Sequence, residues 1–224
     1  NGITSSNLSK LVTFASFALA MAGVQAAETV RLPYLLADAS PTALYYPTFH
    51  LAGALAFFES HCDFRGEMAG LWVTDGSPAG TIKLSSAFVG GLNGPNRVLC
   101  SIQREEGPSL HLFRARDAEH GEEPWVTDGT VEGTRLLEDL VPGLESSFAG
   151  RFTALGDRAF FVAQDSELNA GLWVSDGTTP ETRRLTRDLT FCDYPDWVPW
   201  KGELYFPVHD PARLWGTCQL WASD

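Results

Sequence analysis

One tryptophan-centred phrase recurs along this chain and constrains its fold more than any other feature. It reads LWVTDGSPAGT at 71–81, PWVTDGTVEGT at 124–134 and LWVSDGTTPET at 172–182, and a partial copy, LWASD, occupies 220–224. The four Trp residues of these phrases are separated by 53, 48 and 48 positions. Self-similarity at a period of about 50 residues indicates a repeat architecture in which similar units pack side by side.

The residues around each phrase predict one four-stranded unit, whose strands we name a to d. Short runs rich in Phe, Val, Leu and Trp and bounded by Gly, Asp and Pro are typical of strands. Such runs predict strand a at 48–51, 97–100, 152–155 and 197–200, and strand b at 55–58, 110–113, 159–162 and 204–206. The Trp phrase is strand c, and a following T-x-x-L pattern predicts strand d at 81–84, 134–137 and 182–185. The Asp-Gly pair between c and d is a strong hairpin signal.

Repeated units of this kind predict an all-β fold, a β-propeller of four-stranded antiparallel blades. The blades are expected at 43–89, 96–141 and 151–189, with an incomplete blade at 196–224. A lone strand d at 29–36 fits the T-x-x-L pattern and would complete the last blade. The chain is therefore expected to form about four blades, either as a ring of four or as a fragment of a larger propeller.

The same phrases carry a family resemblance. LWVTDG, PWVTDGT, LWVSDGT and LWASD resemble the ELWxxDGT repeat of secreted bacterial proteins, and the stretch 172–186 is similar to blades of Tol-type periplasmic propellers. The resemblance covers residues 29–224 and implies a propeller-like fold, but it implies no common activity. Pro124, Ser77 and Glu181 depart from the repeat, where Leu, Thr and Gly are expected.

Residues 1–27 have the pattern of an export signal. Lys10 precedes an apolar run at 11–24, and small residues lead to a cleavage point after Ala26 or Ala27. The run is shorter than the roughly 20 apolar residues of a bilayer span, so a signal peptide is expected rather than a membrane anchor. The mature part, 28–224, is expected to be secreted or periplasmic and free of the membrane after cleavage.

Net charge excludes one class of partner. The chain carries 28 acidic residues against 16 Lys and Arg, a formal charge of -12 at pH 7. Nucleic-acid binding requires a basic surface against the phosphate backbone, so it is not expected. No cofactor motif is present, and no cysteine pair has C-x-x-C spacing, so neither a cofactor nor a metal is expected.

Four cysteines in an exported chain are expected to form two disulfides, with three possible connectivities. Because strands alternate in direction, the b–c loops and the d–a linkers lie on one face of a propeller. Cys62 lies in a b–c loop and Cys100 in the next strand a, while Cys192 lies in a linker and Cys218 in the b–c loop that follows. The pairs 62–100 and 192–218 are therefore favoured.

The repeated Asp-Gly pairs are expected to be structural. In this interpretation each carboxylate accepts backbone N–H groups of its own turn, as in the Asp-box of sialidase-type propellers. One Asp per blade cannot supply the six or so oxygens that calcium takes. The residues concerned are Asp75, Gly76, Asp128, Gly129, Asp176 and Gly177. The repeated Trp residues are likewise expected to pack between blades: Trp72, Trp125, Trp173 and Trp221.

The b–c loops differ from one another and form the predicted binding face, because variable loops on a rigid scaffold usually carry function. They span 59–70, 115–123, 164–171 and 209–219. The candidate binding residues are Asp117, Glu119, His120, His209, Asp210, Arg213 and Trp215. An acidic cluster in the second loop, completed by Glu122 and Glu123, leaves a calcium site open as an alternative.

These patterns predict a secreted, non-catalytic β-propeller that presents its b–c loops to a protein or a glycan. The alternative is a secreted glycosidase- or esterase-like hydrolase with its site on the same face. A calcium-dependent adhesion module, or a purely structural one, is a third hypothesis. The G-x-S-x-G phrase that marks the nucleophile of many esterases is absent from the sequence. A glycosidase needs two carboxylates close together in space, which sequence spacing cannot show, so no catalytic residue is assigned.

Overall fold

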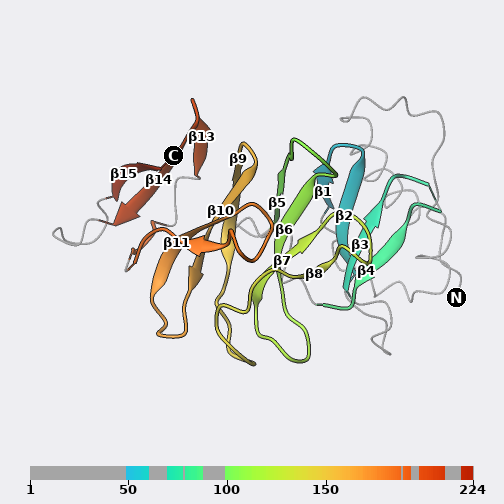
Figure 1. The fold of residues 1–224 in the computed structure, drawn as a ribbon, viewed down its shortest axis with the longest axis horizontal. Helices are drawn as coiled ribbons and strands as arrows, with labels where there is room; N and C mark the ends of the chain where they lie inside the picture. The colour runs from blue at the N-terminus through green and yellow to red at the C-terminus, as the bar shows by residue number, and fades with distance from the viewer. Residues whose placement is uncertain are drawn as a thin grey trace, which may run out of the picture.

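The computed structural model describes residues 49–60, 70–77, 79–87, 99–187, 189–192, 197–209 and 218–223. Within these ranges the regular elements are strands, arranged as separate sheets side by side (Figure 1). The first sheet contains β1 (Phe49–Ala52), β2 (Leu55–Ser60), β3 (Gly70–Thr74) and β4 (Ile82–Ser85). The second contains β5 (Leu99–Ile102), β6 (Leu110–Ala115), β7 (Glu123–Thr127) and β8 (Arg135–Leu136). The third contains β9 (Gly150–Leu155), β10 (Arg158–Gln164), β11 (Ala170–Ser175) and β12 (Arg183–Arg184), and the fourth β13 (Val198–Trp200), β14 (Glu203–His209) and β15 (Cys218–Ser223).

Every sheet is an antiparallel meander in which neighbouring strands follow one another in sequence. The register repeats from sheet to sheet, because the Trp of strand c always lies opposite a Phe of strand b. The pairs are Trp72 with Phe58, Trp125 with Phe113, Trp173 with Phe161 and Trp221 with Phe206. The all-β fold of propeller blades is confirmed by this topology, and within the described residues an observed strand overlaps each predicted strand, while the strand expected at 29–36 lies outside them.

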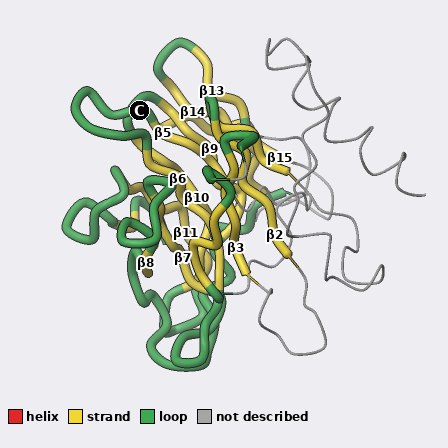
Figure 2. Tube along the Cα trace, turned by 90° about the vertical axis from the view of Figure 1, so that its right-hand side faces the viewer, coloured by secondary structure: helices red, strands yellow, loops and turns green. Residues whose placement is uncertain are grey.

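Three apolar cores hold adjacent blades together, and each core is formed by side chains from two neighbouring sheets. Because neighbouring residues of a strand point to opposite faces, Phe161 of β10 packs toward the second blade and Phe160 toward the fourth. Both rings are fully buried. The first strands also contact one another between blades, β5 against β9 and β9 against β13. Figure 2 shows these strands running together, with the loops at their ends.

The repeated tryptophans are not equivalent in all four sheets. Trp72, Trp125 and Trp173 stack or tilt against the Phe opposite them, with ring centroids 6.2 to 6.4 Å apart. Trp221 is instead 42% exposed. In the described part of the chain, β15 is the edge strand of a three-stranded sheet. The expected packing between blades therefore holds for Trp125 and Trp173, which lie in the cores between neighbouring sheets, whereas Trp72 packs on Phe58 of its own sheet.

The c–d turns repeat one hydrogen-bond pattern. In each turn an Asp carboxylate oxygen accepts both the backbone N–H and the hydroxyl of the residue two positions on, as in Asp128 with Thr130 at 2.9 and 2.7 Å. Asp75 with Ser77 and Asp176 with Thr178 repeat it. The glycines after these aspartates have φ near +90°, a conformation that side chains disfavour. This arrangement is the one that the structural interpretation of the turn expects.

Removing one of these carboxylates should weaken the blade modestly. We expect Asp128→Ala to lower the free energy of unfolding by about 1 kcal/mol, because the Thr130 N–H and hydroxyl lose their acceptor. Urea unfolding monitored by Trp fluorescence measures the change. Glu132→Ala, an exposed change in the same turn, is the matched control and should leave stability within error. An equal loss in both variants would contradict the proposed cause.

The expected signal peptide at 1–27 and lone strand at 29–36 lie outside the described residues. The choice between a ring of four and part of a larger propeller therefore stays a prediction. In the ranges that the structure describes, no helix has the length and apolarity to cross a membrane.

Candidate functional site

One end of the sheets carries the b–c loops and the d–a linkers. Two of these loops are described, 116–122 between β6 and β7 and 165–169 between β10 and β11. The linker 137–149 runs between them, because the Phe148 N–H bonds to the Glu122 carbonyl at 3.2 Å and the Gln164 N–H to the Ser147 carbonyl at 2.8 Å. These segments form what we call the loop face.

The loop 116–122 is closed by Asp117. Its carboxylate oxygen Oδ1 accepts the backbone N–H groups of Glu119 at 2.9 Å and His120 at 2.7 Å, and lies 3.0 Å from His120 Nδ1. Burial alone would raise the pKa of Asp117, but these hydrogen bonds outweigh it and lower the pKa. Of the predicted residues, Asp117 and His120 therefore bind each other, while the Glu119 side chain is exposed.

The loop 165–169 is built in the same way. Asp165 Oδ1 accepts the N–H groups of Glu167 at 2.9 Å and Asn169 at 3.0 Å, and its second oxygen accepts a hydrogen bond from Arg184. The N–H of Asn169 is the largest cause that lowers the pKa of Asp165. Asp117 and Asp165 both precede the blade tryptophan by eight positions, a repeat signal that the sequence analysis missed.

A buried carboxylate ties the linker to the second blade. Glu123, at the start of β7, is fully buried and accepts the N–H groups of Ser147 at 2.9 Å and Leu140 at 3.1 Å. Burial raises its pKa, and the two donors oppose that shift. Blades one and three have Gly70 and Gly171 at this position and the fourth has Gln219, so the second blade alone of these four carries a carboxylate there. A carboxylate held in this way positions the loop face and cannot reach calcium from solvent.

Three large apolar side chains protrude from the loop face. Leu144 and Phe148, in the linker, are 74% and 57% exposed, and Leu168, in the third-blade loop, is 65% exposed. Phe148 and Leu168 also have positive φ values of 52° and 64°. This conformation is uncommon for residues other than glycine and costs about 1 kcal/mol or more. The surrounding hydrogen bonds therefore hold two apolar side chains outward at a conformational cost.

The other predicted binding residues are only partly described. His209 ends β14 and is half-buried, whereas Asp210, Arg213 and Trp215 lie outside the described residues. The structure thus brings Asp117 and His120 together in one loop. His209 lies instead at the end of the fourth blade.

The cysteines follow one of the two expected pairings. Cys192 and Cys218 form a disulfide with Cα atoms 6.5 Å apart. Cys100 is a free thiol, contrary to the expected bond with Cys62, which itself lies outside the described residues. Cys100 is buried among the apolar side chains between the second and third blades, which removes its sulfur from the loop face. That burial raises the pKa of the Cys100 thiol to about 12.

Three metal-ligand side chains also meet at this disulfide. Cys192, His209 and Cys218 offer ligand atoms within 4.8 Å of one another. The expectation of no metal site considered only close sequence spacing, and these residues come from a linker and two strands.

A histidine–serine pair lies at the opposite end of the blades. His111 is buried, its Nδ1 is 2.8 Å from Ser101 Oγ, and its ring centroid is 4.5 Å from that of Phe57. Burial, followed by repulsion from His50, lowers the pKa of His111 to about 4, and Asp128 opposes this. A base this weak and this enclosed is poorly suited to activating Ser101.

A polar cavity of about 260 Å³ lies at the turns of the third blade. Its charged lining residues include Asp157, Arg158, Asp176 and Arg183. Asp176 already accepts the N–H and hydroxyl of Thr178. The cavity is thus partly a consequence of the repeated turn, and it does not join the loop face.

Comparison with known proteins adds one distant likeness. No protein-family model matches the chain, and no curated protein sequence matches it. Among solved structures it is similar to the endo-arabinase from Bacteroides thetaiotaomicron VPI-5482, with a TM-score of 0.36 and 14% identity over 79% of this chain and 73% of that chain. Values this low carry no argument about activity, so function is inferred from the loop face itself.

Proposed function

We propose that this chain is a secreted, non-catalytic propeller module whose loop face binds a protein or a glycan. The observation that carries the proposal is the outward placement of Phe148 and Leu168 on a positive-φ backbone. Exposed apolar groups with a polar rim are typical of binding surfaces. Strained backbone, in turn, is often kept where function needs it.

The charged groups beside these residues support binding rather than hydrolysis. A glycosidase needs two carboxylates placed on either side of the scissile bond. In the described loops, Asp117 and Asp165 are each occupied by two backbone N–H groups and by a basic side chain. Their role is to hold loop shape, which pre-organises the face and lowers the entropic cost of binding.

Secretion or periplasmic location belongs to the same proposal. The Cys192–Cys218 disulfide is of a kind that persists in oxidising compartments. Together with the export pattern of residues 1–27, it favours a ligand met outside the cytoplasm.

Binding can be tested with the exported chain on an array of plant and bacterial oligosaccharides and on a panel of purified basic and acidic proteins. We expect a ligand whose affinity falls at least about 10-fold in Phe148→Ser/Leu168→Ser, since buried apolar anchors typically contribute over 1 kcal/mol each. Val131→Ser is the control, because Val131 is 49% exposed but lies in a c–d turn at the other end.

Two results would overturn the proposal. One is a ligand that binds the double Ser variant as tightly as the parent chain. The other is turnover of chromogenic glycosides or esters that disappears in Asp117→Ala, which would establish the hydrolase alternative.

A further inference from the structure

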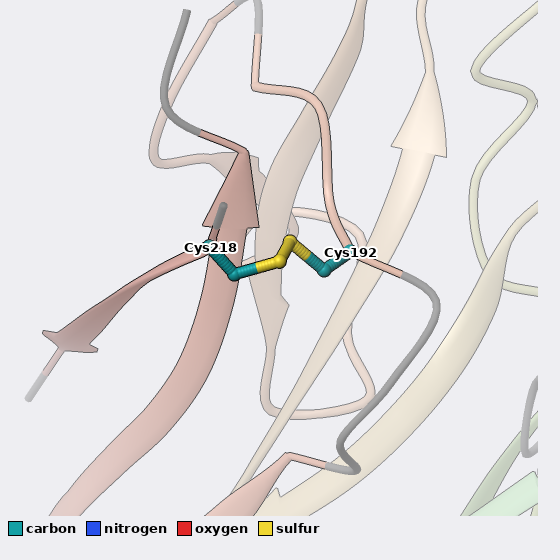
Figure 3. The surroundings of a disulfide bond; sticks show 2 residues. All are labelled: Cys192 and Cys218. Atoms are coloured by element: carbon teal, nitrogen blue, oxygen red, sulfur yellow. A yellow bond between two sulfur atoms is a disulfide. The ribbon is translucent and has the colours of Figure 1, made fainter. Parts of the chain in front are cut away.

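We propose that Cys192, His209 and Cys218 form a three-ligand zinc site when the disulfide between the two cysteines is reduced. Figure 3 shows the two cysteines facing each other, Cys218 at the beginning of β15 and Cys192 on the linker before β13. The disulfide and the metal are alternative occupants of one position, because the same two sulfurs form either bond.

The backbone brings the three ligands together independently of the sulfur–sulfur bond. His209 and Cys218 lie directly opposite each other in the β14–β15 ladder. The linker runs along the other side of β14, where the Cys192 N–H bonds to the Pro207 carbonyl at 3.2 Å and the His209 N–H to the Thr190 carbonyl at 2.8 Å. An isolated bridge between Phe191 and Val208 continues this pairing. These bonds should persist after reduction.

The distances suit a tetrahedral ion. Zinc binds sulfur at about 2.3 Å and imidazole nitrogen at about 2.0 Å, so the ligand atoms of one site lie about 3.5 to 4 Å apart. The three ligand atoms here all lie within 4.8 Å of one another, with the two sulfurs joined in the disulfide. After reduction the sulfurs must separate to about 3.8 Å to bind one ion, and rotation of the two cysteine side chains, whose Cα atoms are 6.5 Å apart, can supply this movement.

Ligand type and exposure favour zinc with one open position. Two thiolates and one imidazole form a set that zinc takes readily, and two thiolates neutralise its charge. Cys192 is buried, His209 is half-buried and Cys218 is exposed, so one side of the site is covered and the other faces solvent. Water would fill the fourth position from that open side.

The chemistry requires an external dithiol or a phosphine as reductant. A dithiol gives two hydrogens to the disulfide, which yields two cysteine thiols, and becomes a disulfide itself. A phosphine yields the same two thiols by consuming one water molecule, whose oxygen it keeps as the phosphine oxide. Zinc then binds as both thiols release their protons, while His209 binds through a neutral ring nitrogen. The ion would keep the linker attached to the fourth blade while the covalent bond is absent.

Cobalt provides the test, because thiolate-bound tetrahedral cobalt has charge-transfer and d–d bands. The full chain is reduced anaerobically with a phosphine, freed of metal and titrated with Co²⁺, then with Zn²⁺. We expect one Co²⁺ per chain with thiolate bands after reduction only, and displacement by one equivalent of Zn²⁺. His209→Ala should weaken binding by at least about 100-fold, because losing even outer-shell partners costs about 10- to 100-fold.

Two controls separate this site from the other thiols and histidines. Cys62→Ala/Cys100→Ala should keep the full signal, and His120→Ala should bind like the parent chain. The proposal is overturned if the reduced chain binds no Co²⁺ with thiolate bands. It is equally overturned if binding survives His209→Ala unchanged or disappears in the Cys62/Cys100 variant.

Discussion

Lowering the pH through the range from about 6.5 to about 4 is expected to destabilise the first two blades by about 3 kcal/mol through His111 alone. The unfolded chain binds a proton at the ordinary histidine pKa of 6.5, whereas the folded chain resists it until about pH 4. Between these values the unfolded state carries more protons, so stability falls as the pH falls. Above pH 6.5 His111 is neutral in both states, so it no longer makes stability depend on pH.

The surroundings of His111 explain the size of this effect. The imidazole is 3% exposed and packs on Phe57 between the first and second blades. His50, whose own pKa is lowered by burial, would repel a charged ring, and the attraction of Asp128 compensates only in part. Protonation thus places a charge in an apolar interface.

Urea unfolding at pH 7 and at pH 4.5 measures the difference. His111→Leu/Ser101→Ala removes the titrating group together with its hydrogen-bonding partner, and it should flatten the pH dependence. His120→Ala, which removes a more exposed histidine, should retain it. A parent chain equally stable at both pH values would show that His111 does not control this interface.

Replacing Glu123 by Ala is expected to lower the free energy of unfolding by about 3 kcal/mol, because one buried and one partly buried N–H group lose their acceptor. Ser147 and Leu140 belong to the linker of the loop face, so the same change should loosen that face. We therefore expect faster hydrogen exchange at 137–149 and weaker ligand binding.

Glu123→Gln is the matched variant. Its amide oxygen can accept one of the two hydrogen bonds, while its NH2 group replaces the carboxylate oxygen that accepts the other. Because a neutral group also avoids the burial cost that raises the pKa of Glu123, we expect a smaller loss than for Ala, measured by urea unfolding and exchange mass spectrometry. Equal losses for Gln and Ala, or exchange confined to the turns at the other end, would contradict the anchoring role.

The fold could be predicted from the sequence because its signals are local and repeated. Strand c follows from one tryptophan phrase, and the c–d turn from Asp-Gly, so each blade could be located without long-range information. The exposure of Trp221 could not be predicted in this way. It depends on what lies against β15 in space, which a phrase similar to those of three less exposed tryptophans does not encode.

The loop face was predicted only in outline, because its decisive features depend on backbone conformation. The sequence indicated Asp117 and His120 as binding residues, and that stays a prediction; the hydrogen bonds that they make within their own loop were not predicted. Phe148 and Leu168 look like ordinary core residues until their positive φ turns them outward. The pairing of Cys100 failed because the side of the strand on which its sulfur lies determines whether it can reach a loop.

In the four sheets that the structure describes, each ladder of β hydrogen bonds lies within one stretch of sequence, and neighbouring sheets meet mainly through side chains. A few hydrogen bonds join neighbouring sheets. Thr179 Oγ1 donates to the Leu137 carbonyl at 2.6 Å, and the Arg135 guanidinium donates to the Gly177 carbonyl at 3.1 Å. Such a chain can lengthen by duplication of the DNA that encodes one sheet, since the strands of the new sheet form their backbone hydrogen bonds with one another. Sequence changes can then accumulate in the loops at the ends of the strands while the duplicated sheets keep their structure.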